Sequence, residues 1–427
     1  MTPSTWKRSL TLVAACFVGL AQGDLSAAIF KASIATRVVT PNPLLPVSGG
    51  VGPSHAVSTK KGELTVRALV MESGETRAAI ISTDFLGFPA VLGDRIRNAT
   101  TTIPKNSILI GATHTHSAPD AYGFPDGKGG FSADLKYLDE VVNQTVDAID
   151  EAVQSLEPSK IKIATGEAKG KIAFNYYAEH LYDPRCDVIQ FLSDQNIPFA
   201  TLVNYAVHPE VLGPSAGIIS PDLVGPLYDQ IKAKGGGTGI FMNGAQGGMV
   251  TADNRNDDGS DSRTWNECVR IGSLLANEAL RIVSSAPIQN APSLSVHAER
   301  VSFPVESDLL WQVMKLSPLN YSQSEERSIA TTVNLINLGT AQILTIPGEA
   351  LPNIGYYLKR NMRGDHNLLF GLTNDAFGYI LTKVDWNSFK RYDYISRTSL
   401  GEQTGEIFIA EALKMISSVP APESDAR

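Results

Sequence analysis

Two histidines, His114 and His116, stand two residues apart directly after a short apolar run at residues 107–110. Such a run is typical of a buried strand. Side chains two residues apart in an extended chain point to the same side, so both imidazoles are expected to face one space beyond the strand. Open α/β sheets usually place their sites at this carboxyl edge. One imidazole there can bind a metal ion while the other moves a proton, although a structural His pair explains the spacing equally well.

Other apolar runs also end in side chains that can do chemistry. These side chains are Asp84 after residues 80–82, His208 after 203–207, Asn243 after 240–242, Glu349 after 343–346, and Asn374, Asp375 and Tyr379 after 368–372. If the strands lie parallel in one sheet, all of these groups converge on one rim, as a catalytic site requires. Simpler interpretations remain open: His208 as a loop histidine, Glu349 as the start of a helix over 350–359, and Tyr379 as a core tyrosine.

The elements that would position these residues alternate along the chain. Apolar periodicity predicts helices over 89–99, 135–156, 223–234, 265–284, 350–359 and 402–417, and further strands over 64–72, 77–82, 160–164 and 188–192. This alternation predicts the α/β class. We expect one large domain over residues 24–418, with a central, mainly parallel or mixed sheet flanked by helices, a metal site at the strand carboxyl ends, and a polar tail at 419–427.

Composition narrows the class of protein. The chain has 427 residues, of which 43% are hydrophobic and 19% charged, with a net charge of −8. This acidic balance, without a Lys/Arg cluster, argues against a nucleic-acid partner. Residues 1–23 have the pattern of an export signal, with Lys7 and Arg8 before an apolar run, which predicts a secreted or periplasmic protein. Lipid anchoring through Cys16 is the alternative.

Two further cysteines, Cys186 and Cys268, would remain after removal of the signal segment. In an oxidising compartment they could form a disulfide. They could equally be two buried thiols, and the sequence leaves both possibilities open.

Five motifs, taken together and in order, make the function more specific. They are THTHSAP at 113–119, NYAVHP at 204–209, NGAQGG at 243–248, IPGE at 346–349 and NDAFGY at 374–379. In order and spacing they resemble the neutral/alkaline ceramidase family. The similarity covers roughly residues 30–415, which corresponds to the amino-terminal catalytic domain of that family. Its members are zinc amidases that hydrolyse ceramide to sphingosine and a fatty acid.

The resemblance implies one Zn²⁺ per chain and a set of ligands. Carried over residue by residue, these ligands are His114, His208, Glu349 and Tyr379. Two imidazoles, a carboxylate and a phenolate suit zinc, although the phenol pKa of about 10 must fall before Tyr379 can bind. The resemblance also places His116 beside the metal as general acid/base or oxyanion donor, and Tyr394 near the scissile bond.

The sequence departs from the family pattern in the region that should contact the substrate. Where the family carries an Asn-Arg pair, this chain has Asn175 and Tyr176, so the donor that the guanidinium provides is either lost or replaced by the hydroxyl of Tyr176. After the glycine run, Met249 replaces an acidic residue, and Thr251 is expected to replace a serine that contacts the substrate. These changes affect the predicted substrate more than the predicted reaction.

The sequence therefore predicts an exported zinc-dependent amidohydrolase that acts on an N-acyl (sphingo)lipid or a similar amide and contacts membrane surfaces transiently. A first alternative keeps the site but cleaves an ester, a lactone or a non-lipid amide. A second alternative is a binding homologue without turnover. The polar, tyrosine-rich segment 175–182 is unlike the aliphatic lining that a pocket for two acyl chains should have.

Overall fold

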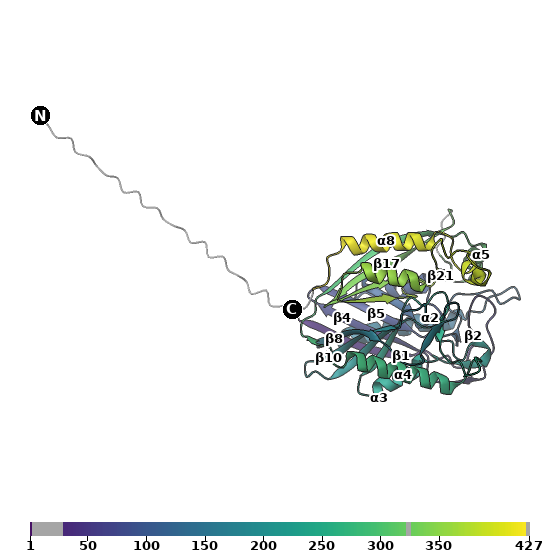
Figure 1. Ribbon diagram of the computed structural model, residues 1–427, viewed down its shortest axis with the longest axis horizontal. Helices are drawn as coiled ribbons and strands as arrows, with labels where there is room; N and C mark the ends of the chain where they lie inside the picture. The colour runs from purple at the N-terminus through teal and green to yellow at the C-terminus, as the bar shows by residue number, and fades with distance from the viewer. Residues whose placement is uncertain (2–28, 322–325, 424–427) are drawn as a thin grey trace.

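The computed structural model describes Met1, residues 29–321 and residues 326–423 (Figure 1). Apart from Met1, the predicted signal segment 1–23 and its Cys16 lie outside the described residues. Within the described part, no helix is long and apolar enough to cross a bilayer. Cys186 and Cys268 are both buried and are not bonded to one another, which matches the interpretation as two buried thiols.

A large mixed sheet of nine strands forms the centre of the molecule. Its order is β13-β11-β10-β8-β1-β4-β5-β6, and β15 pairs with β8. The bounds are β1 (Phe30–Val38), β4 (Thr65–Ser73), β5 (Thr76–Thr83), β6 (Ile108–Ala112), β8 (Glu157–Glu167), β10 (Arg185–Ser193), β11 (Pro198–Tyr205), β13 (Thr238–Asn243) and β15 (Ile288–Gln289). The pairs β5/β6 and β11/β13 are parallel, whereas the strand pairs between them are antiparallel.

The large sheet curves so that its two ends come close together. The Arg67 side chain on β4 donates to the carbonyl of Gly239 on β13 at 2.8 Å, and the Ser82 hydroxyl on β5 donates to Phe241 at 2.6 Å. These contacts join strands that lie at opposite ends of the hydrogen-bonding order. The carboxyl ends of β6 and β11 are brought to the same region by this curvature.

A second sheet of four strands packs on the first. Its order is β16-β17-β18-β20, with bounds β16 (Leu294–Pro304), β17 (Ser328–Leu338), β18 (Ala341–Thr345) and β20 (His366–Phe370). Side chains such as Leu69 and Ile240 from the large sheet meet Ile336 and Ile343 from the small one in a single apolar layer. The apolar runs before Glu349 and Asn374 therefore lie in a different sheet from those before His114 and His208.

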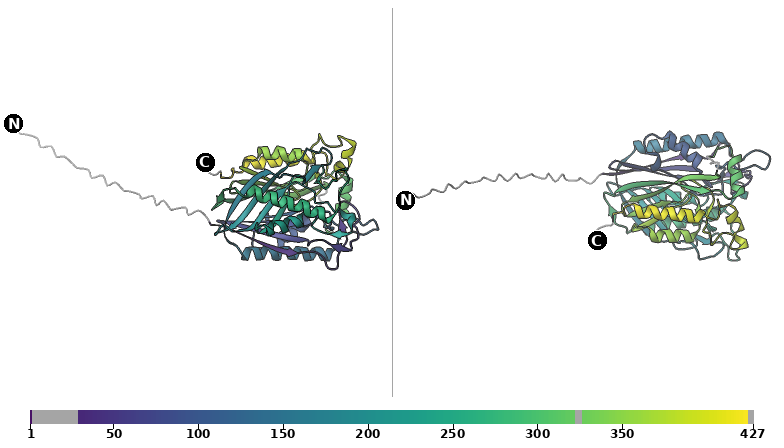
Figure 2. Two further views of the ribbon diagram at one scale, coloured as in Figure 1. Left: turned by 60° about the horizontal axis from the view of Figure 1, so that its bottom comes forward. Right: turned by 90° about the horizontal axis from the view of Figure 1, so that it is seen from above.

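Helices cover the outer faces of both sheets, as Figure 2 shows with α2 in blue and α8 in yellow on opposite sides of the strands. The bounds are α1 (Ala90–Ala99), α2 (Leu135–Gln154), α3 (Val224–Ala233), α4 (Trp265–Val283), α5 (Asp308–Leu316), α6 (Pro352–Asn361), α7 (Asp393–Arg397) and α8 (Thr404–Ser418). Helices α1 and α2 pack on one half of the large sheet and α3 and α4 on the other. Helices α5, α6 and α8 share a core with the small sheet.

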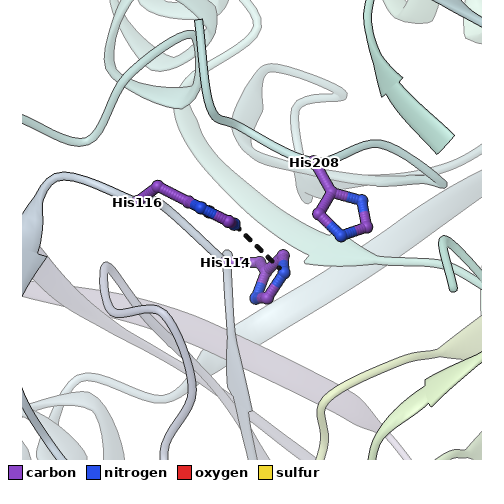
Figure 3. Close-up of side chains that lie close together, drawn as sticks. All are labelled: His114, His116 and His208. Atoms are coloured by element: carbon purple, nitrogen blue, oxygen red, sulfur yellow. Dashed lines mark hydrogen bonds between the residues drawn. The ribbon is translucent and has the colours of Figure 1, made fainter. Parts of the chain in front are cut away.

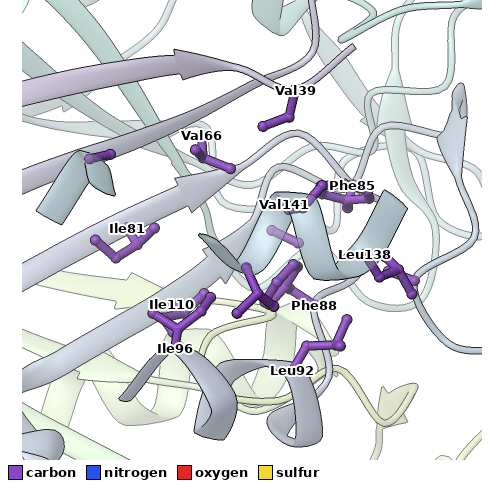
Figure 4. Close-up of a cluster of buried hydrophobic side chains, with 14 of the residues drawn as sticks. Val39, Val66, Ile81, Phe85, Phe88, Leu92, Ile96, Ile110, Leu138 and Val141 are labelled. Carbon is purple, nitrogen blue, oxygen red and sulfur yellow. The ribbon is translucent and has the colours of Figure 1, made fainter. Parts of the chain in front are cut away.

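Helix α2 illustrates how the sequence forms these layers. Leu138, Val141 and Ile149 recur at helical spacing, and they pack with Val66 and Ile81 of the sheet (Figure 4). Asp134, directly before the helix, caps it, because its carboxylate accepts a hydrogen bond from a backbone N–H in the first turn at 2.9 Å.

Short strand pairs outside the two sheets organise the loops. They are β2 (Val47–Ser48) with β7 (Ala118–Pro119), β3 (Thr59–Lys60) with β12 (Ile218–Ile219), β9 (Ala173–Asn175) with β14 (Val250–Ala252), and β19 (Glu349–Ala350) with β21 (Tyr379–Ile380). The predicted α/β class with a mixed sheet flanked by helices is confirmed. The second sheet and α5 were not predicted. The assignment of residues 24–418 to one catalytic domain stays a prediction.

Candidate metal centre

The carboxyl ends of three parallel strand pairs meet at one place. His114 follows β6, His208 follows β11, and Glu349 follows β18 after a short turn. The partner strands β5, β13 and β20 run parallel to them. The predicted convergence of strand ends therefore occurs, but it is achieved by a curved sheet and a second sheet rather than by one parallel sheet.

His114 is held in a strained turn directly after β6. Its φ of 74° lies in the left-handed region, which residues with a side chain adopt rarely and usually where a site requires it. Its backbone N–H donates to Phe85 at 2.9 Å, and its ring Nδ1 lies 2.5 Å from the carbonyl of Leu86. With Nδ1 occupied by a backbone carbonyl, Nε2 is left to face the site.

His208 and Glu349 form the second half of the site. The Nδ1 atom of His208 lies 2.9 Å from the carbonyl oxygen of Val250, and its Nε2 lies 3.1 Å from Oε2 of Glu349. The same carboxylate oxygen lies 3.5 Å from Nε2 of His114. Two imidazole nitrogens therefore converge on one carboxylate oxygen, and all three side chains are buried.

His116 completes a group of three imidazoles (Figure 3). Its Nε2 lies 3.4 Å from Nε2 of His114, and one ligand atom from each of His114, His116 and His208 lies within 4.8 Å of the other two. The ring centres of His114 and His208 are 4.6 Å apart, whereas those of His116 and His208 are 5.9 Å apart. His116 thus belongs to the group but lies at its edge.

Burial controls the charge of these groups. It lowers the pKa of His114 and of His116 to about 3, because a buried imidazolium loses its hydration. Burial also opposes the charged form of His208, but the hydrogen bond and negative charge of Glu349, together with Glu210 and the carbonyl of Val250, outweigh burial and raise the pKa. For Glu349, burial favours the neutral acid, yet the nearby His114 and His208 lower the pKa. At neutral pH the site therefore presents neutral imidazoles at His114 and His116 beside a carboxylate.

The donor set fits a metal ion. Metal-bound histidines usually direct the second ring nitrogen at a carbonyl or carboxylate, and the Nδ1 atoms of His114 and His208 both do so here. Two imidazoles with a carboxylate are a common ligand set of catalytic zinc sites. Because all three groups are buried and both imidazoles are held by backbone carbonyls, the side chains are already arranged around a position that a cation can occupy.

Tyr379, the fourth ligand implied by the resemblance, is next to Glu349. The two residues are directly paired in the parallel strands β19 and β21. The hydroxyl of Tyr379 donates to the sulfur of Met249 at 3.1 Å, and burial raises its pKa well above the ordinary value. As a ligand, Tyr379 would have to exchange this hydrogen bond for the metal, which would also favour loss of its proton.

A cavity of about 320 Å³ lies beside the histidines, with His114, His116, Glu349, Tyr379 and Tyr394 in its wall. Its apolar wall is formed by Leu86, Phe124, Leu310, Val313, Met314 and Phe377. Three of these side chains come from α5, a helix that contains none of the five motifs. The wall that would contact an apolar substrate therefore could not be found from motifs.

Of the other predicted site residues, Tyr394 lines the cavity, whereas Thr251 and Tyr176 do not. Tyr394 lines the cavity, and its ring meets that of Tyr379 edge to face at 6.0 Å. Thr251 does not line the cavity, because its hydroxyl donates to Glu210 at 2.6 Å. Tyr176 is 68% exposed and also lies outside the cavity wall. The structure thus brings Tyr394 to the site but not the hydroxyl of Tyr176.

Asn243 fixes the relative positions of the two histidine loops. Its amide nitrogen donates to the carbonyls of Thr113 and Val207, which directly precede His114 and His208. Its amide oxygen accepts from the backbone of Val207 at 3.1 Å. One fully buried side chain at the end of β13 therefore joins the ends of β6 and β11.

Asn243→Ala is expected to lower the free energy of unfolding by about 2–5 kcal/mol, because the buried backbone groups of Thr113 and Val207 lose their hydrogen bonds to this side chain. Urea unfolding followed by circular dichroism measures this loss. Asn361→Ala, an exposed position at the end of α6, is the control and should change stability by less than about 0.5 kcal/mol. Equal stability of the two variants would contradict the connecting role of Asn243.

Gly247 lies against the backbone of Glu349. Its N–H donates to Ala350 at 2.9 Å, and a methyl group at this position would overlap the carbonyl oxygen of Glu349. This close approach explains why the chain has glycine here, since the obstacle is backbone that cannot rotate away.

Gly247→Ala is expected to displace Glu349, to destabilise the fold by about 1–3 kcal/mol and to weaken metal binding. Thermal unfolding and metal titration measure the two effects. Gly166→Ala is the matched control, because its added methyl would meet only the Ile282 side chain, at 3.0 Å. Unchanged metal affinity in Gly247→Ala would show that the position of Glu349 is not set by this contact.

Comparison with solved structures identifies the architecture. A neutral ceramidase structure from Pseudomonas aeruginosa matches with a TM-score of 0.72 over 94% of this chain and 77% of that chain, at 15% sequence identity. The chain has the neutral ceramidase fold. A structure of ceramidase complexed with C2 matches similarly, with a TM-score of 0.71 over 93% of this chain and 77% of that one, also at 15% identity. No family model and no curated protein matches the sequence.

The neutral ceramidase fold confirms the structural part of the resemblance seen in the five motifs. It also shows why those motifs lie so far apart in sequence, since each follows a strand whose carboxyl end reaches the same site. Glu210, next to His208-Pro209, was not singled out as a site residue from the sequence. It lies 3.6 Å from His116, and only its position directly after a motif could have drawn attention to it.

Proposed function

We propose that this protein is an exported zinc-dependent amidohydrolase that cleaves the amide bond of an N-acyl lipid or a similar amide. The observation that carries the proposal is the convergence of His114, His208 and Glu349 beside a cavity with an apolar wall, within a neutral ceramidase fold. Export is inferred from residues 1–23 of the sequence and is part of the proposal.

The metal would be held by His114, His208 and Glu349, with Tyr379 as the fourth candidate ligand. When bound, zinc supplies Lewis-acid chemistry, lowering the pKa of water to about 7 and polarising the acyl carbonyl. Among the metals that accept imidazole and carboxylate ligands, zinc suits a hydrolysis that needs no change of oxidation state.

The side chains of the protein supply the remaining functions. The Nε2 atom of His116 faces the ligand cluster, so it is placed to take a proton from water and pass it to the leaving amine. Tyr394 lies in the cavity wall, where its hydroxyl can donate to the developing oxyanion. Leu310, Val313 and Met314 of α5 offer an apolar surface to an acyl chain and exclude water from it.

Esters, lactones and non-lipid amides could use the same groups, so the proposal is tested with a substrate panel. The mature protein is purified, its zinc content is measured, and release of amine or alcohol is followed from ceramides, other N-acyl amines, esters and lactones. One zinc per chain with release of sphingosine from ceramide supports a ceramidase. If zinc is present and only other substrates are hydrolysed, the protein is a zinc hydrolase with a different substrate. If zinc is present without any turnover, the protein is a binding homologue.

A further inference from the structure

Glu210 has its two carboxylate oxygens directed at different partners. Oε1 accepts a hydrogen bond from the Thr251 hydroxyl at 2.6 Å, and Oε2 lies 3.6 Å from Nδ1 of His116. The side chain of Glu210 is only 24% exposed, so its carboxylate is largely shielded from water. The chain at this point is fixed as well, since the backbone N–H of His116 donates to the carbonyl of Pro209 at 3.2 Å.

The two ring nitrogens of His116 face opposite environments. Nε2 points toward the ligand cluster, 3.4 Å from Nε2 of His114, while Nδ1 points toward Glu210. A histidine that exchanges a proton at one nitrogen needs the proton on its other nitrogen held in place, because otherwise both tautomers are populated. A carboxylate facing the second nitrogen has this effect in other hydrolases. The backbone of Gly49 also contacts the His116 ring.

A purely structural role does not account for the placement of Glu210. The two loops that its carboxylate would join are already connected, because the N–H of His208 donates to the carbonyl of Val250 at 2.8 Å. His208 and Thr251 also form an isolated parallel bridge. The hydrogen bond from Thr251 therefore adds little to this connection, but it does fix the carboxylate so that the other oxygen faces His116.

We propose that Glu210 is a positioning residue for His116, and that Thr251 holds Glu210 in place. Glu210 orients the imidazole and keeps its proton on Nδ1, which leaves Nε2 as the atom that exchanges a proton with water and the leaving group. This inference rests on the proposed hydrolase function and assigns to Thr251 a role behind His116 in place of the expected substrate contact.

The kinetic test uses four variants of the metal-loaded protein. Glu210→Ala is expected to lower kcat about tenfold to hundredfold, with KM within about twofold and zinc content unchanged. Glu210→Gln should recover most of this loss, because an amide oxygen can still accept from Nδ1–H. Thr251→Val should give a smaller loss in kcat. Glu75→Ala is the control, since Glu75 is an exposed carboxylate in the turn before β5, at the opposite end of that strand from the site.

A second measurement does not depend on turnover. Nitrogen-15 NMR of the zinc-loaded protein should show His116 protonated at Nδ1 in the parent and a mixture of tautomers in Glu210→Ala. An unchanged kcat in Glu210→Ala, or a loss of kcat that simply follows a loss of zinc, would overturn the inference. So would a parent His116 protonated at Nε2. If no substrate is turned over but the tautomer is as expected, the proposed function fails and the positioning role stands.

Discussion

His208→Ala is expected to remove most of the metal from the purified protein and to lower hydrolysis by about 10³-fold or more. The imidazole of His208 is completely buried, and its Nε2 lies 3.1 Å from Oε2 of Glu349. Its removal takes one donor from the cluster and leaves the buried carboxylate with His114 as its remaining imidazole partner. Metal per chain after gel filtration and initial rates on the substrate panel measure the two effects.

The control for this variant is His297→Ala. His297 lies on β16 and is absent from the cavity wall, so both metal content and rate should stay at the parent level. The side chain of His208 also contributes to packing, and thermal unfolding of the metal-free proteins shows whether the variant remains folded. Equal metal content in the folded variant and the parent would contradict the ligand assignment.

His116→Ala is expected to lower turnover by about 10²–10⁴-fold while the protein keeps its metal. The reason is that His116 lies at the edge of the imidazole group, since its ring centre is 5.9 Å from that of His208 whereas the His114 ring is 4.6 Å away, and that Glu349 contacts His114 and His208. Metal content, kcat and KM of the variant separate proton transfer from metal binding.

The result for His116 also decides between two roles that its position allows. One ring nitrogen of His116 lies within 4.8 Å of ligand atoms of both other histidines, as a third imidazole ligand would. Loss of metal together with activity would make His116 a ligand and remove the proposed acid/base group. His116→Gln provides a polar control of similar length that cannot take up a proton at neutral pH.

Much of the fold was predictable because its signals are local. The apolar spacing over 135–156 predicted α2, and the apolar runs over 64–72 and 77–82 predicted β4 and β5, since both signals depend on neighbouring residues. The pairing of strands was not predictable in the same way. The apolar run at 343–346 predicts a strand but does not indicate which sheet the strand joins. The neighbouring residues therefore do not show that β18 belongs to the second sheet.

The residues of the candidate site also fall into those that local sequence predicts and those that it does not. His114, His208 and Glu349 could be named from the sequence because each follows an apolar run within a motif. Thr251 was expected to contact the substrate, but its hydroxyl is directed at Glu210. Tyr176 was expected beside the substrate as well, yet it is exposed on the surface. Side-chain direction in loops depends on distant partners, which a motif does not contain.

The sequence by itself determined which chemical groups follow the predicted strands. Residue type and short-range periodicity are sufficient for that inference. Only the tertiary structure decided which groups meet: the curvature of the large sheet brings His208 to His114, and the second sheet adds Glu349. It also decided that Glu210 stands behind His116 and that α5 forms the apolar wall. These contacts join segments far apart in the chain, and they form only when the complete core packs.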